Sequence, residues 1–216
     1  MQKNKKATII IIIFILIYGL LSEFLLRPKI NMVYTYLINP IIWIGIAVIL
    51  KLTLGKSYEI KKLKKDIISY SLIAVLAYII TYLISGLFIT FGKNPYSRTL
   101  LGIITNLWSF ATVIIAKEYI RYKLINNVYE KDKIKIAVFI SIVYISIDLG
   151  IRQFFITQMT GLFIMETVAQ TLLPLIMKNI LYSYTAINAN YLPAMCYELG
   201  TKLYLCLVIF NFCDII

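Results

Sequence analysis

Residues 7–26 read ATIIIIIFILIYGLLSEFLL, an apolar run that follows Lys3, Lys5 and Lys6. As an α-helix rising 1.5 Å per residue, a run of about 20 residues crosses the ~30 Å hydrocarbon core of a bilayer. A secretory signal peptide shares the basic start, but its apolar core is shorter and ends at a small-residue cleavage site. Residues 22–25, Ser-Glu-Phe-Leu, offer no such site. The sequence therefore predicts an uncleaved spanning helix.

Six further apolar runs follow, at residues 33–52, 67–91, 100–116, 136–155, 161–184 and 192–212. Each approaches or reaches the length of a spanning helix. Backbone groups in lipid must be hydrogen-bonded internally, so runs of this length are expected to form helices. The sequence predicts a single integral membrane domain over residues 1–216, an all-α, polytopic transmembrane helix bundle of about seven spans. The last two runs are the weakest, which leaves six spans as the alternative count.

The composition supports a membrane protein and excludes several other classes. Apolar residues make up 61% of the 216 residues and charged residues 15%, and the mean hydropathy is +0.84. Soluble domains are closer to 45–50% apolar and about 25% charged. The chain has no histidine, which argues against zinc proteases built on His-Glu motifs and against Ser-His dyads. We expect no metal, no cofactor and no nucleic acid, although the net charge is +12.

The basic residues alternate between the connections in a way that predicts orientation. The N-terminal tail and the connections around residues 51–65 and 117–135 carry 15 Lys and Arg, whereas the intervening connections carry 5. Basic residues accumulate on the cytoplasmic side of a membrane. We therefore expect a multi-pass protein of the bacterial cell membrane with a cytoplasmic N-terminus. Seven spans would place the C-terminus outside, and six would place it inside.

The segment 58–66 contains four lysines and two acidic residues. One interpretation is an amphipathic helix on the cytoplasmic leaflet, where anionic lipids attract lysines by about 1 kcal/mol each. The other is a solvated loop that only sets topology. Under either interpretation the lysine-rich loops predict anionic lipids as partners.

Polar and ionisable side chains inside spans are costly, so each needs a partner or a purpose. The candidates within or beside the predicted spans are Asn106, Glu118, Arg121, Asp148, Arg152, Lys178 and Asn179. Spacings of three and four residues predict ion pairs between Glu118 and Arg121, at the end of the fourth span, and between Asp148 and Arg152. Asn106 is expected to hydrogen-bond between helices.

No catalytic motif accompanies these candidates. The sequence has no Gly-x-Ser-x-Gly, no phosphate-binding loop and no paired-cysteine metal spacing. A Ser-Lys pair would be chemically possible without histidine. Ser183, however, lies five residues from Lys178, about 140° around a helix. Lys178 is instead expected to pair with Glu166 or Glu198 on another helix, or to extend to the interface.

Several stretches carry a resemblance to a known family. Residues 92–97 read Gly-Lys-Asn94-Pro95-Tyr96-Ser and lead to a helix with Asn106 that ends in Glu118-Tyr-Ile-Arg121. Lys178-Asn179 and the segment 190–194 follow later. Over roughly residues 70–216 the chain resembles the multi-spanning N-terminal region of some signal peptidase I-related proteins of clostridia and other Firmicutes. In that family the catalytic Ser and Lys belong to a later extracytoplasmic domain, so no catalytic residue carries over.

The resemblance implies a non-catalytic membrane domain that anchors or positions a partner or substrate in protein secretion or processing. The partner would be a separate peptidase or secretion component; a degenerate relative or an incomplete gene product are the other origins. The alternative function is a small transporter subunit, such as the substrate-binding component of an energy-coupling-factor transporter. Against it, residues 9–17 offer no small residues for close helix contact. An intramembrane hydrolase is the least favoured class.

Overall fold

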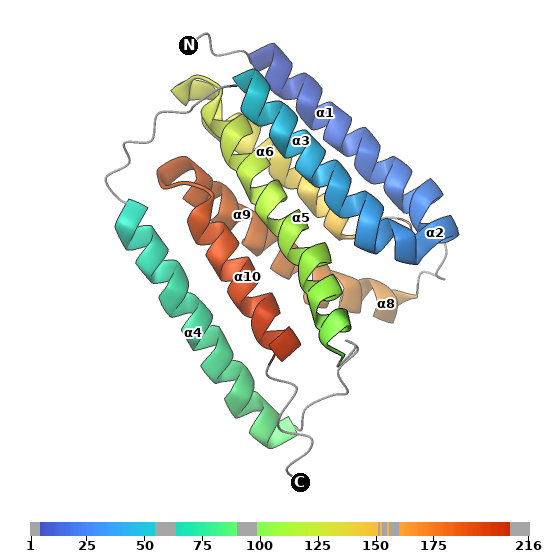
Figure 1. The fold of residues 1–216 in the computed structure, drawn as a ribbon. Coiled ribbons are helices and arrows are strands. Elements are labelled where there is room, and N and C mark those ends of the chain that lie inside the picture. The colour runs from blue at the N-terminus through green and yellow to red at the C-terminus, as the bar shows by residue number, and fades with distance from the viewer. Residues whose placement is uncertain are drawn as a thin grey trace.

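The computed structural model describes residues 5–54, 64–89, 99–150, 152, 155 and 160–207. All regular secondary structure in these residues is helical, which confirms the all-α prediction (Figure 1). The elements are α1 (Lys5–Leu21), the π-helix η1 (Ser22–Leu26), α2 (Arg27–Val33), the π-helix η2 (Tyr34–Ile38), α3 (Asn39–Leu54), α4 (Lys64–Ile89), α5 (Leu100–Asn126), α6 (Glu130–Asp148), α8 (Gly161–Glu166), the π-helix η3 (Thr167–Leu172), α9 (Leu173–Asn188) and α10 (Leu192–Leu207).

Five helices in the described part of the chain are long and apolar enough to cross a membrane. They are Lys5–Leu26, Ile30–Leu54, Lys64–Gly86, Leu100–Asn126 and Gly161–Asn188. The remaining two predicted spans fall on α6, whose first two turns are rich in charge, and on α10, which is described over 16 residues. All seven predicted runs therefore lie on helices, and five of them meet the length and composition of a span.

Helix boundaries differ from the predictions at three places. The break between the first two runs stays helical, with a kink at Ile30, whose φ and ψ are −139° and 46°. α5 continues past residue 116 to Asn126 because its polar residues there find partners inside the bundle. α6 ends at Asp148, well before residue 155, and Gly150 follows with a φ of 65°, a left-handed conformation that glycine adopts readily.

Successive long helices run in opposite directions, so their ends fall into two groups. Figure 1 shows the start of α1, the end of α3 and the start of α4 at the same end of the bundle. Two long-range contacts join the start of α1 to the turn between α5 and α6. Lys5 Nζ lies 2.9 Å from Asp132 Oδ1, and Asn127 Nδ2 donates to Thr8 Oγ1 at 3.1 Å. The connections predicted to share one side of the membrane thus share one end of the bundle.

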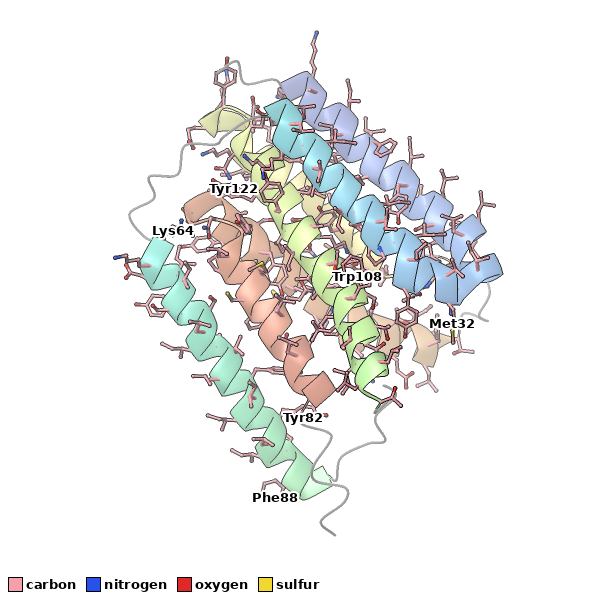
Figure 2. The ribbon with its side chains drawn as sticks, in the orientation of Figure 1. Met32, Lys64, Tyr82, Phe88, Trp108 and Tyr122 are labelled. Atoms are coloured by element: carbon pink, nitrogen blue, oxygen red, sulfur yellow. The ribbon has the colours of Figure 1, made fainter. Side chains whose placement is uncertain are left out.

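The core lies between α1, α3, α5 and α6. Trp43 is its largest member, and its ring meets those of Tyr18 and Tyr144 edge-on, with centroids 6.1 and 5.9 Å apart. Buried isoleucines from α1, α5 and α6 surround these rings. Many apolar side chains of α1 and α4 instead project away from the bundle (Figure 2), as with the 83% exposed Phe88. Such an apolar outer surface suits contact with lipid rather than water.

α4 packs chiefly against α10, and the contact is close because α10 presents a glycine. A β-carbon placed on Gly200 would lie 2.6 Å from Val75 Cγ1 and 3.0 Å from its Cγ2. Small residues allow helices to approach closely in a membrane, where apolar burial alone does not drive helix association.

We predict that Gly200→Ala destabilises the protein by about 1–3 kcal/mol, because the added methyl must displace the β-branched Val75. The measurement is the thermal unfolding midpoint of the purified chain in a mild detergent. Gly45→Ala is the matched control, since no atom lies within 4 Å of its new β-carbon. Equal midpoints for the two variants would contradict close α4–α10 packing.

Candidate functional site

A cavity of about 410 Å³ lies inside the bundle and is bordered by η2, α3, α5, α6, α9 and α10. One part of its lining is charged, with side chains from four helices. A second part is apolar. The charged residues are Lys117, Asp148, Lys178, Glu198 and Lys202; the apolar ones are Phe110, Val113, Ile114 and Leu175; the neutral polar ones are Thr35, Asn39 and Ser109.

The charges lie well below the end of the bundle that carries the α5–α6 and α9–α10 turns. At 1.5 Å per residue, Lys117 lies about 14 Å along α5 from Asn126. Lys178 lies about 15 Å along α9 from Asn188 by the same measure. Charged groups at such depth in membrane proteins face the interior or a water-filled space and mark functional sites by default.

Two sets of ion pairs neutralise most of this charge. Lys117 Nζ lies 2.5 Å from Asp148 Oδ1, which joins α5 to α6. Glu198 Oε1 receives two ammonium groups, from Lys178 at 2.5 Å and from Lys202 at 3.3 Å. The predicted pairing of Lys178 with Glu198 on another helix is thereby confirmed.

The predicted pair between Asp148 and Arg152 is wrong, since Asp148 takes Lys117 as its ion-pair partner among the described residues. The prediction assumed a continuous helix, in which residues four apart share a face. α6 ends at Asp148 and the chain turns at Gly150. Arg152 therefore does not follow Asp148 by one helical turn.

Arg121 is the centre of a buried polar network beside the cavity. Its side chain is 2% exposed. Nη2 donates to Asn179 Oδ1 at 2.7 Å, and Nη1 donates to Ser183 Oγ at 3.0 Å and to the Asn179 carbonyl oxygen at 3.2 Å. Ser183 also shares a 2.8 Å hydrogen bond with Ser141 on α6. The network thus ties α5, α6 and α9 together.

The predicted pair between Glu118 and Arg121 is confirmed, but its location differs from the prediction. Arg121 Nε lies 3.2 Å from Glu118 Oε2, and the two side chains are buried inside the bundle rather than at a helix end. The Nε–H group is not aligned for a hydrogen bond to any described acceptor. Attraction between the two charges, rather than a directed bond, therefore holds this pair. The guanidinium also lies 4.9 Å from the ring centroid of Tyr144, a favourable cation–π distance.

Asn106 hydrogen-bonds between helices, as predicted. Its Oδ1 accepts from the hydroxyl of Tyr36 at 2.9 Å, and Trp108 Nε1 donates to the Tyr36 carbonyl oxygen at 3.2 Å. The predicted site residues Asn94, Pro95 and Tyr96 lie outside the residues that the structure describes.

Sequence reasoning missed two parts of this site. It did not place Lys117 and Lys202 at a cavity, although the i, i+4 spacing of Glu198 and Lys202 was a usable signal. It also missed Asn39, which accepts hydrogen bonds from Tyr18 at 3.0 Å and Tyr34 at 3.3 Å. These tyrosines come from elements distant in sequence, so spacing alone gave no indication.

The arrangement favours binding over bond-breaking chemistry. Lys178 contacts Glu198, and Ser183 contacts Arg121 and Ser141, so this serine and this lysine do not form a nucleophile–base pair. No group of three or more His, Cys, Asp or Glu that could hold a metal occurs in the described part of the chain. The cavity therefore offers fixed charges and an apolar wall.

Comparison with known proteins gives no relative from which a function could be transferred. No family model matches the sequence, and neither curated proteins nor solved structures provide a match.

We predict that Arg121→Met destabilises the fold by about 3–5 kcal/mol, because it leaves Glu118 as an unpaired buried charge. Adding Glu118→Gln should recover part of that loss. The measurement is a double-mutant cycle on the unfolding midpoint in detergent. Glu130→Gln is the control, since its carboxylate is 80% exposed at the start of α6. Additive effects of the two substitutions would contradict coupling between Glu118 and Arg121.

Proposed function

We propose that the chain crosses the bacterial cell membrane seven times, with its N-terminus in the cytoplasm. Support comes from the seven predicted runs, all of which lie on helices of one bundle, and from the 15 to 5 division of basic residues. α6 and α10 belong with the spans in this proposal because their buried polar residues face other helices. Asp148 meets α5, and Glu198 meets α9.

We further propose that the protein is a non-catalytic membrane domain that anchors or positions a partner or substrate in protein secretion or processing. The observation that carries this proposal is the ion pairing inside the bundle. Lys117, Lys178 and Lys202 each lie within 3.3 Å of a carboxylate. A lysine that acts as a base must instead stand beside the nucleophile. The partner class, a separate peptidase or secretion component, follows from the resemblance to signal peptidase I-related membrane regions. Anionic lipids at the lysine-rich loops are the second proposed partner.

The second candidate is a small transporter subunit that binds a solute, and the charged cavity is the observation that favours it. A volume of about 410 Å³ falls within the roughly 300–1,000 Å³ of small-molecule sites. The two candidates differ in what the cavity does, because a transporter subunit needs a ligand there and a membrane anchor does not.

We predict that a single cysteine at position 129 is labelled by a membrane-impermeant maleimide only from the cytoplasmic side, and one at position 32 only from outside. Met32 and Tyr129 are 77% and 54% exposed, and Figure 1 places their elements at opposite ends of the bundle. The background is a variant with Cys196, Cys206 and Cys213 replaced by serine. Labelling of both positions from the same side would contradict the topology.

We predict that the purified chain does not cleave a signal-peptide substrate at neutral pH, because no serine–lysine pair is assembled around Lys178. An active signal peptidase I in the same detergent is the control. Cross-linking in bacterial membranes, followed by mass spectrometry, should identify a peptidase or secretion component. Cleavage that is abolished by Lys178→Ala would make the chain an enzyme. Cross-links to proteins unrelated to secretion would contradict the partner class.

A further inference from the structure

The charges that line the cavity do not balance. Three lysines face it, with two carboxylates to match them, so the described lining carries a net charge of +1. The next buried carboxylate, Glu118, is already matched by Arg121. An uncompensated charge within a membrane domain is costly unless water or a counter-ion reaches it.

The geometry identifies Lys202 as the unbalanced group. Glu198 Oε1 is shared by two lysines, and Lys178 holds it at 2.5 Å while Lys202 stands at 3.3 Å. The Lys178 side chain is 28% exposed, whereas that of Lys202 is 46% exposed. Lys117 is occupied by Asp148 at 2.5 Å. Lys202 is therefore the ammonium group of the cavity that is most accessible and least closely held by a carboxylate.

The remaining lining describes the rest of the ligand. Phe110, Val113, Ile114 and Leu175 form an apolar wall, and Thr35, Asn39 and Ser109 add neutral hydrogen-bonding groups. Small-molecule sites commonly combine an apolar surface with a few polar groups that fix orientation. A compact apolar body that carries one negative charge would satisfy both parts of this cavity.

We infer that the cavity binds a small organic monoanion of the carboxylate class, with the anionic group on Lys202 and the apolar body against the wall formed by α5 and α9. The bound carboxylate would complete a set of three ammonium groups and three carboxylates. This inference rests on the second candidate function, to which it adds the ligand class. It requires neither catalysis nor a protein partner.

The test measures binding to the full chain purified in a neutral detergent, with benzoate as the probe. Benzamide and benzylammonium are its neutral and cationic counterparts of similar size. Benzoate should bind saturably by isothermal titration calorimetry and raise the thermal unfolding midpoint, because a ligand that binds only the folded state stabilises it. The two counterparts should do neither. Equal responses to all three compounds, or no response to benzoate at millimolar concentration, would overturn the inference.

Variants of Lys202 test the assignment of the charge. Lys202→Met should weaken benzoate binding at least about tenfold, as expected for loss of a charge-assisted hydrogen bond, and Lys202→Arg should retain it. Lys65→Met is the matched control, because Lys65 is an exposed lysine outside the cavity. Unchanged benzoate affinity in Lys202→Met would overturn the assignment. If Lys202→Met does not fold, the charge series on the unmodified chain and on Lys202→Arg decides the question.

Failure of this inference and failure of the proposed functions have separate readouts. Peptide cleavage or cross-links outside secretion would remove the membrane-domain proposal and leave the calorimetry unchanged. Charge-selective benzoate binding without uptake of benzoate by vesicles containing the chain would remove a transport role and keep the anion site. Absence of benzoate binding would remove the anion site alone.

Discussion

The buried guanidinium of Arg121 imposes the constraint on which the interior depends. A charge that is withdrawn from water loses its hydration and must be compensated by protein groups. Around Arg121 these groups are Glu118 on its own helix and Asn179 and Ser183 on α9. Each contact fixes a position on a different element, so that solvation of one side chain also sets how α5 and α9 lie against each other. Ser141 extends the same set to α6 through Ser183.

The same constraint explains why the charges of the bundle are gathered in one region. Outward positions on α1 and α4 are apolar, which suits lipid, and Lys117, Lys178 and Lys202 face inward towards carboxylates. Ion pairs between helices satisfy these charges without water, but they also need space for long side chains. The cavity is the consequence of grouping five such side chains from four helices in one place.

The sequence was sufficient for the class of fold and for local pairs, and insufficient for contacts that depend on where helices end. Apolar runs of about 20 residues predict helices because lipid admits few other structures. The pair between Glu118 and Arg121 follows from their spacing on one helix. The pair between Lys117 and Asp148 joins residues 31 positions apart and depends on the end of α6 before Gly150. The kink at Ile30 and the continuation of α5 to Asn126 likewise reflect packing against neighbouring helices rather than local hydropathy.

Neutralisation of buried charge also bears on what the bundle does. A serine–lysine mechanism needs an amine beside a hydroxyl, yet Lys178 lies on Glu198, and Ser183 serves Arg121. The groups that could have supplied a base and a nucleophile are therefore used to solvate the interior. The exception is Lys202, which shares an oxygen that Lys178 already holds more closely. A bundle that commits its reactive groups to structure and leaves one ammonium accessible is suited to hold an anion, and it is poorly suited to break a bond.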